Sequence, residues 1–209
     1  AKLTGSSAGA LVGGCYASGC SIDELKEQLF ALQREDFWDP GVGLGLLKGD
    51  LFRRQIRNIC NVSNVEECPI PFRVSVFNLA SWGTEVIDQG CLTHAIAASC
   101  AFPFLFQPVA LNGARYLDGG IKDRPGLQGT QPGERILYHH ISSKSPWRRK
   151  NSPALRIPRA ENMQTITISG LPRVGPNTLQ YGVPAFDYAY AQTSGLLQQT
   201  VLEIDNNMR

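Results

Sequence analysis

Gly5-Ser6-Ser7-Ala8-Gly9 has the form G-x-S-x-G, with Ser7 at its centre. Where this motif serves catalysis, the serine lies at a sharp turn between a strand and a helix, and its hydroxyl is exposed. Flanking glycines, here Gly5 and Gly9, let the backbone pass close to its neighbours because they carry no Cβ atom. We therefore expect Ser7 to be a nucleophile. A tight turn that only opens a helix has the same pattern and is the alternative.

The residues on both sides of this motif indicate a strand before it and a helix after it. Ala1–Thr4 reads as the end of a strand, and Ala8–Ser18 as a helix of small residues that ends at Gly19. The N-terminus of a helix favours negative charge, so the backbone N–H of Ala8 is expected to face a developing oxyanion.

Two later stretches of the sequence indicate which protein family the chain resembles. Ala98–Val109 reads A-S-C-A-F-P-F-L-F-Q-P-V, and Gly113–Gly120 reads G-A-R-Y-L-D-G-G. Together with G-x-S-x-G, and in this order, they resemble the motifs of the patatin-like phospholipase family. The resemblance covers residues 1–125 well. It implies a three-layer α/β/α domain with a largely parallel central sheet, and a catalytic dyad of Ser7 and Asp118.

The D-G-G motif is expected to bring the acid to the serine. A short strand before it would deliver Asp118 to the same sheet edge as Ser7. Gly119 and Gly120 would let the chain turn away at once and approach the serine turn closely. The family often has Asn before the following proline, whereas this chain has Arg124. A cation there would favour the charged form of Asp118 and weaken it as a base.

The resemblance implies a lipid acyl hydrolase that cleaves carboxylic esters through an acyl-enzyme, with no cofactor and no metal ion. Two alternatives stay open. One is a catalytically idle family member that binds lipid or another protein, which Arg124 would favour. The other is an acyltransferase with the same elbow, which would need an acyl carrier or coenzyme A.

The family's Gly-rich oxyanion loop lies upstream of the elbow, and no comparable loop precedes Ser7 in this sequence. The chain begins at Ala1, without an initiator Met and inside the expected strand. We therefore interpret it as an N-terminally truncated fragment. Since removal of one oxyanion donor typically costs about 10² to 10³ in turnover, the fragment alone is expected to be severely impaired.

The histidines offer a competing base. In hydrolases with a Ser-acid-His order the histidine follows the acid, but His94 precedes Asp118. We interpret His94 as structural. His139 and His140 do follow the acid, yet they lie within an expected strand, where one points inward and the other outward. A conventional triad through either of them is the alternative hypothesis.

Bulk composition limits the classes of function. The chain has 209 residues, of which 43% are hydrophobic, which predicts one soluble globular domain over residues 1–209. The net charge of +2 gives no reason to expect a nucleic-acid partner. No window approaches the roughly 18 consecutive apolar residues of a spanning helix, so membrane contact would be interfacial. These features favour a cytoplasmic or peripheral membrane protein, without deciding between them.

The six cysteines show no C-x-x-C pair and no histidine at zinc-ligand spacing, which favours free thiols over a metal site or a disulfide framework. They are Cys15, Cys20, Cys60, Cys68, Cys91 and Cys100.

Alternation of helical and strand patterns favours the α/β class along the rest of the chain. The expected elements are a helix from Ser21 to about Arg34, a connector over Gly41–Gly49, a helix from about Asp50, a hairpin over 72–87, a helix over Leu92–Cys100, strands at 135–142 and 165–168, and a helix from Pro184. The Gly-rich connector lacks Gly-Lys-Ser/Thr, which argues against a phosphate-binding loop.

A basic loop with several prolines is expected over residues 144–159, which contain six Lys and Arg residues and no acid. With Trp147 it would contact anionic lipid headgroups. A solvated insertion is the alternative.

Overall fold

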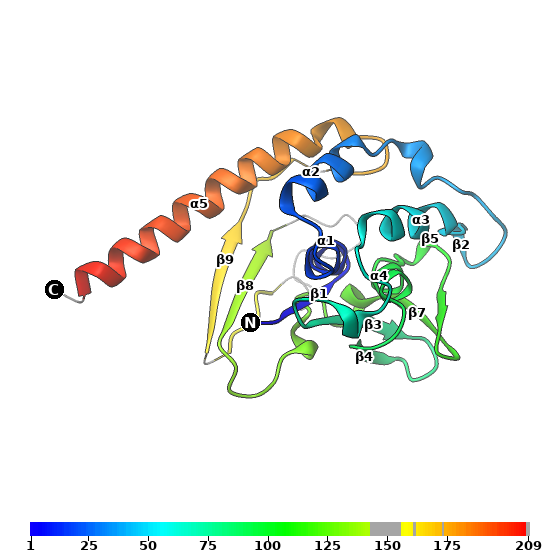
Figure 1. Ribbon diagram of the computed structural model, residues 1–209, viewed down its shortest axis with the longest axis horizontal. Coiled ribbons are helices and arrows are strands. Elements are labelled where there is room, and N and C mark those ends of the chain that lie inside the picture. Colours follow the sequence, from blue (N-terminus) through cyan, green and yellow to red (C-terminus); the bar gives the residue numbers. More distant parts are fainter. Residues whose placement is uncertain (143–155, 161, 173, 208–209) are drawn as a thin grey trace. The chain divides into compact units, whose positions relative to one another are not determined.

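The computed structural model describes residues 1–142, 156–160, 162–172 and 174–207 (Figure 1). The chain divides into two compact units, Ala1–Pro132 and Gly133–Arg209. The single domain over residues 1–209 stays a prediction. The expected basic loop lies outside the described residues from 144 to 155, so the lipid contact of Trp147 also stays a prediction.

The first unit contains most of the elements that the sequence predicts, and α1, α3 and α4 begin at the expected residues. Its elements are β1 (Leu3–Ser6), α1 (Ala8–Ala17), α2 (Ile22–Ala31), β2 (Gly45–Leu47), α3 (Asp50–Ile59), β3 (Phe72–Asn78), β4 (Gly83–Ile87), α4 (Leu92–Ser99), β5 (Phe104–Phe106), β6 (Val109–Leu111) and β7 (Ala114–Asp118). A capping box formed by Ser21 and Glu24 begins α2. The helix ends at Ala31 because Leu32 is extended.

The central strand of this unit is β3, which pairs with one strand along one edge and with two strands along the other. The antiparallel strand β4 pairs with β3 along Val74–Asn78, so it occupies one edge. The other edge is used by two strands in succession: β1 pairs in parallel with Phe72–Ser75, and β7 pairs antiparallel from Asn78 back to Val76. Because their directions are opposite, the C-terminal ends of β1 and β7 meet at this edge.

The predicted α/β class is confirmed, and three of the five strands of this sheet run in the same direction. β6 pairs antiparallel with β7, so β1, β3 and β6 run in one direction, and β4 and β7 run in the other. Three of the four strand pairings in this sheet are antiparallel: the hairpins β3–β4 and β6–β7, and the pair β3–β7. A short connection can only join antiparallel neighbours, which explains why the sheet is mixed.

Helices α1 and α4 cover one face of β3, and the hydrophobic core lies between them. Val74 and Val76 are fully buried there. The small residues of α1 permit close helix packing: a Cβ atom on Gly14 would lie 2.6 Å from Cδ1 of Ile96 on α4. Within this unit, the other face of β3 is covered by the segment 119–130, whose short 3-10 turns take the place of a long helix.

The second unit contains β8 (Ile136–Ile141), which pairs in parallel with β9 (Met163–Ile168), and α5 (Gly182–Asn207). Along β8 the side chains alternate, so His140 is buried and His139 is exposed. The sequence predicted both strands, the start of the long helix to within two residues, and this alternation of the two histidines.

Candidate active site

Ser7 lies between β1 and α1, as the motif predicts. Its φ of 54° is in the left-handed region, which non-glycine residues rarely adopt. Such backbone strain persists only when surrounding contacts hold it, and it is the conformation expected of an exposed nucleophile at a strand-to-helix turn.

The side chain of Ser7 meets Asp118 directly. The Ser7 hydroxyl donates a hydrogen bond of 2.7 Å to Oδ2 of Asp118. The other carboxylate oxygen, Oδ1, accepts a hydrogen bond of 2.7 Å from the backbone N–H of Gly120. Asp118 is only 5% exposed, and its own N–H donates to the carbonyl of Ala101. The carboxylate is therefore fixed with one oxygen facing the serine.

The glycines of the two motifs differ in how closely other atoms approach them. A Cβ atom on Gly5 would lie 2.6 Å from the carbonyl carbon of Gly9, so the close approach expected at Gly5 is present. A Cβ atom on Gly9 would meet nothing within 4 Å, so the absence of a side chain is not required there. On the acid side, a Cβ atom on Gly119 would lie 2.0 Å from the carbonyl oxygen of Ser75, and one on Gly120 would lie 2.9 Å from Oδ1 of Asp118. Both turn glycines are therefore needed.

Ala8 is the first residue of α1 and is exposed. The hydrogen bonds from the first turn to the carbonyl of Ser7 come from Ala10 and Leu11. The first N–H groups of a helix have no partner within it, so the Ala8 N–H suits an external acceptor. Its role as an oxyanion donor stays a prediction.

The C-terminal end of α4 holds the backbone of Ser7 on both sides. The N–H of Ser7 donates to Oγ of Ser99 at 2.8 Å, and Ser99 in turn donates to the carbonyl of Ser75 at 2.7 Å. The thiol of Cys100 donates to the carbonyl of Ser7 at 3.2 Å. Desolvation by burial and the charge of Asp118 raise the pKa of Cys100, so this thiol stays protonated. Sequence reasoning noted the A-S-C-A run but missed this role.

Ser99 is fully buried and touches the strained residue, so we expect Ser99→Ala to impair both stability and chemistry. It leaves the N–H of Ser7 without its partner, which should cost about 1–3 kcal/mol of unfolding free energy. Loss of this restraint on Ser7 should also lower kcat about tenfold or more, measured with a short soluble ester.

Ser18→Ala is a matched control for this experiment. Ser18 is equally buried, donates to the carbonyl of Cys15 at 2.6 Å and accepts from the N–H of Asn61 at 3.1 Å, but it does not touch Ser7. It should lose similar stability and keep its turnover. If both variants retain the same kcat, Ser99 has only a structural role.

A second buried carboxylate organises the segment after the D-G-G turn. Asp123 accepts a hydrogen bond of 2.6 Å from the hydroxyl of Ser75, and bonds of 3.0 Å from the N–H groups of Leu127 and Gln128. Asp123 thus ties this segment to β3 beside the end of β7. Its neighbour Arg124 is the residue that departs from the family pattern, and the expected effect of Arg124 on Asp118 stays a prediction.

Each of the three histidines has a side-chain partner within its own unit. His94, on α4, lies 3.1 Å from the thiol of Cys91, and burial together with Arg53 and Arg57 lowers the pKa of His94. In the second unit, His139 pairs with Thr193 at 3.1 Å and His140 with Tyr138 at 2.8 Å.

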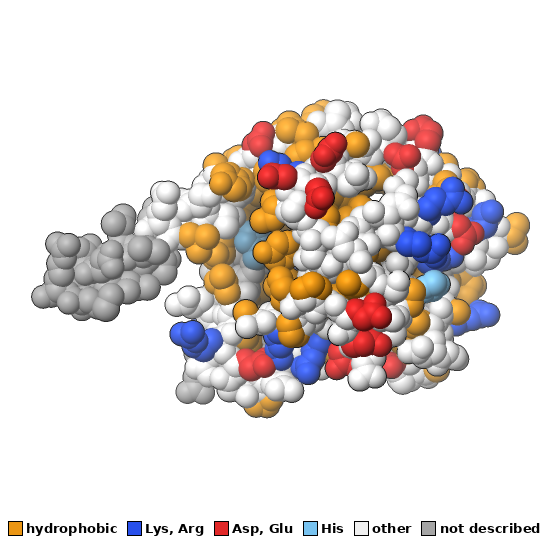
Figure 2. Space-filling view, in the orientation of Figure 1, with side chains coloured by type: hydrophobic (Ala, Val, Ile, Leu, Met, Phe, Trp, Pro, Cys, Tyr) orange, Lys and Arg blue, Asp and Glu red, His pale blue; other side chains and the backbone are white. Residues whose placement is uncertain are grey.

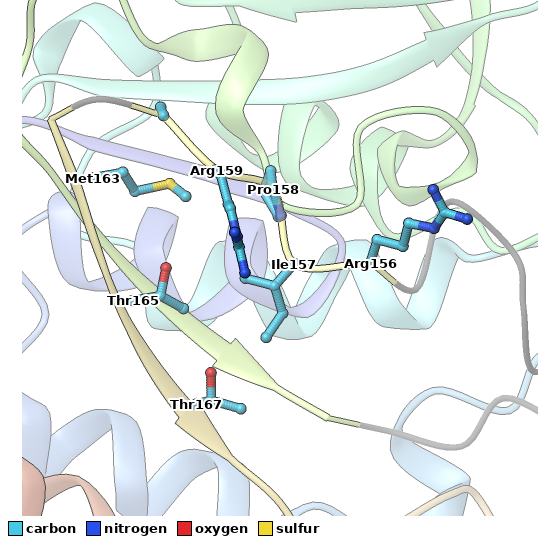
Figure 3. Close-up of a pocket in the computed structure, with 8 residues that line it drawn as sticks. Arg156, Ile157, Pro158, Arg159, Met163, Thr165 and Thr167 are labelled. Carbon is cyan, nitrogen blue, oxygen red and sulfur yellow. The ribbon is translucent and has the colours of Figure 1, made fainter.

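A cavity of about 620 Å³ lies in the second unit (Figure 3). Residues of β9 form one wall, and the segment 156–160 forms the other. Figure 3 shows the side chain of Arg159 extended towards Ile157, whereas Arg156 projects away. The lining residues are Arg156, Ile157, Pro158, Arg159, Ala160, Met163, Thr165 and Thr167.

The described part of the chain has neither a cluster of metal-binding side chains nor a membrane-spanning helix. No cluster of three or more His, Cys, Asp or Glu side chains there is arranged to hold a metal ion. No described helix combines the length and apolar character that crossing a bilayer requires.

Comparison with known proteins gives a consistent set of similarities. Residues 1–128 match the family model described as patatin-like phospholipase. An uncharacterised NTE family protein of Mycobacterium tuberculosis is 31% identical over 125 residues, which are 58% of this chain and 34% of that protein. The lysophospholipase NTE1 of Debaryomyces hansenii is 27% identical over 143 residues, which are 65% of this chain and 9% of that protein.

Among solved structures, the crystal structure of VipD from Legionella pneumophila is similar, with a TM-score of 0.63 and 16% identity. The match covers 93% of this chain and 60% of VipD, and it shows a shared fold. The chain spans less than two thirds of the length of each of these three proteins.

Proposed function

Because this chain belongs to the patatin-like phospholipase family, we propose that it hydrolyses acyl esters of lipids, with Ser7 as the nucleophile and Asp118 as the general base. The observation that carries the proposal is the 2.7 Å hydrogen bond from the Ser7 hydroxyl to Asp118. This distance lies within the range that proton abstraction requires, about 2.6–3.2 Å.

In the acylation step, the oxygen of Ser7 attacks the ester carbonyl carbon while its proton passes to Oδ2 of Asp118. The carbonyl oxygen becomes an oxyanion at the N-terminus of α1, where the N–H of Ala8 and the helix dipole would stabilise it. When the tetrahedral intermediate collapses, the bond to the alcohol oxygen breaks. The alcohol leaves with the proton from Asp118, and the acyl group stays on Ser7.

In the deacylation step, water attacks the acyl-enzyme and gives its proton to Asp118. The second collapse releases the fatty acid, and the proton returns to the oxygen of Ser7. The fixed carboxylate suits both steps because Gly120 holds Oδ1 and leaves Oδ2 for the proton.

A fluorophosphonate probe tests the proposal, since it labels an activated serine whatever the substrate. We expect the protein to be labelled at Ser7, which peptide mass spectrometry would identify, and Ser7→Ala to abolish labelling. Ser6→Ala is the matched control, because the Ser6 hydroxyl is buried and has no hydrogen-bond partner among the described residues. A well-folded protein that the probe leaves unlabelled would support the idle, lipid-binding alternative instead.

A further inference from the structure

Two segments of the first unit form a small projection that we call the β2–β5 tip, residues 41–47 and 102–106. β2 and β5 pair in parallel, with Gly45 opposite Phe104. The side chain of Gln107 donates to the carbonyl of Val42 at 3.0 Å, and the N–H of Gly41 donates to the carbonyl of Leu46. The sequence predicted only a flexible connector at 41–49, whereas these bonds make it an ordered turn.

The base of this tip is also fixed. The carboxylate of Asp39 accepts hydrogen bonds from the N–H groups of Gly49 and Leu51, at 2.9 and 3.0 Å, and so caps the start of α3. The rings of Phe52 on α3 and Phe106 on β5 have centroids 5.4 Å apart. The tip therefore has a defined position on its own unit.

This ordered tip carries large apolar side chains that face solvent. Phe104 is 86% exposed, Leu44 is 70% exposed, and Val42 is fully exposed; Leu46 and Phe102 are partly so. Apolar groups gathered on one exposed feature indicate an interaction surface more strongly than scattered ones do.

Phe104 also has a strained backbone, with a φ of 66°. A bulky residue rarely adopts this region, and glycine does so without a steric cost. An exposed aromatic side chain in such a conformation adds little packing to the fold. This combination indicates that the side chain of Phe104 serves an external contact.

Exposed cations lie directly after β2 and on α3, the helix whose Phe52 packs against Phe106 of the tip. Lys48, Arg54 and Arg57 are exposed, and the only acidic residue of α3, Asp50, is paired with Arg53. Figure 2 shows hydrophobic and basic side chains next to one another at the right-hand edge, where Figure 1 labels β2 and β5. An apolar projection with a positive border complements the surface of an anionic membrane.

We propose that the β2–β5 tip docks the protein on an anionic phospholipid bilayer, inserting Phe104, Leu44 and Val42 among the headgroups while Lys48, Arg54 and Arg57 contact phosphate. The proposal rests on the proposed function, because a lipid substrate places the enzyme at a membrane. The tip is also continuous with the site: Phe102 directly follows Ala101, whose carbonyl accepts the N–H of Asp118.

The test measures co-sedimentation of the full-length protein, in the Ser7→Ala background, with vesicles of phosphatidylcholine and phosphatidylglycerol. Phe104→Gly should weaken vesicle binding about tenfold, because it removes one inserted aromatic side chain. The same change should leave the thermal unfolding midpoint unchanged or raise it, because glycine relieves the strain at this φ. A structural role for Phe104 would instead lower the midpoint.

Replacing Lys48, Arg54 and Arg57 together by Ser should weaken binding about a hundredfold at low salt, since each cation near the surface contributes roughly fivefold. The difference should shrink at high salt and be small on phosphatidylcholine alone. Trp82→Ser is the matched control: Trp82 is 66% exposed but lies in the β3–β4 turn, so vesicle binding should not change.

Vesicle binding that is the same in Phe104→Gly, the triple variant and the parent would overturn the proposal. So would a dimer of the parent that Phe104→Gly converts to a monomer without any effect on vesicles, which would assign the tip to contact between copies. Since binding is measured without the nucleophile, failure of the proposed hydrolase would appear separately, as absent labelling with vesicle binding intact.

Discussion

Ser7→Ala should reduce hydrolysis of a short soluble ester by the full-length protein about 10⁴-fold or more, and Asp118→Asn should be nearly as severe. Serine without a base is a poor nucleophile, and the amide of Asn cannot take its proton. Asn nearly preserves the shape of Asp and can still accept the hydrogen bond from Gly120, so the thermal unfolding midpoint of Asp118→Asn should change little.

The losses of activity in Ser7→Ala and Asp118→Asn should not add in the double variant. In the proposed dyad Ser7 and Asp118 act as one unit, so the double variant should be about as slow as the slower single variant. Initial rates and unfolding midpoints of the three variants measure this directly. Retained activity in Asp118→Asn, or its loss in a folded His139→Ala or His140→Ala variant, would identify a histidine as the base and would exclude the dyad.

The juxtaposition of Ser7 and Asp118 could be expected only through the family resemblance. Periodicity predicts β1, β3 and β7 one at a time, because it reports which residues face a core. It does not report that β1 and β7 share one edge of β3 and meet end to end, since that arrangement depends on pairing between distant segments. The ordered motifs G-x-S-x-G and D-G-G supplied this information.

The supporting contacts were harder to predict than the dyad. Ser99 lies 92 positions from Ser7, and nothing in its local sequence distinguishes a serine that binds a backbone N–H from one that fills space in a helix. The same is true of Asp123, because its local sequence does not show that it is buried against Ser75. Such contacts are set by the packed fold, where most buried polar groups have a hydrogen-bond partner.

The exposed β2–β5 tip shows a second limit of prediction from the sequence. Val42 and Leu44 alternate with glycine in a stretch that the sequence predicts to be a connector. Their apolar side chains did not indicate whether they would be buried or exposed. Strand β2 is three residues long and is defined by its pairing with β5, which local propensity cannot reveal.

Gly5→Ala should be the most destabilising of the conservative changes at the elbow. The new Cβ atom would lie 2.6 Å from the carbonyl carbon and oxygen of Gly9 and 2.8 Å from the nitrogen of Ala10, all of them backbone atoms that cannot move aside alone. Relief requires α1 to shift away from β1. We expect a loss of about 3 kcal/mol or more in the free energy of unfolding, measured by urea denaturation.

Any Gly5→Ala protein that still folds should also be a poor enzyme. Ser7 is placed between β1 and α1, so a shift of α1 moves its oxygen relative to Asp118, and a displacement of about 1 Å can cost about 10²-fold in rate. Gly9→Ala is the matched control for the fold, because its Cβ atom meets nothing within 4 Å. The unfolding free energy of Gly9→Ala should stay within about 1 kcal/mol of that of the parent. Any change should be an increase, because Ala has a higher helix propensity than Gly. Equal stability of the two variants would show that β1 and α1 do not approach as closely as this structure has them, and the strained turn at Ser7 would then need another explanation.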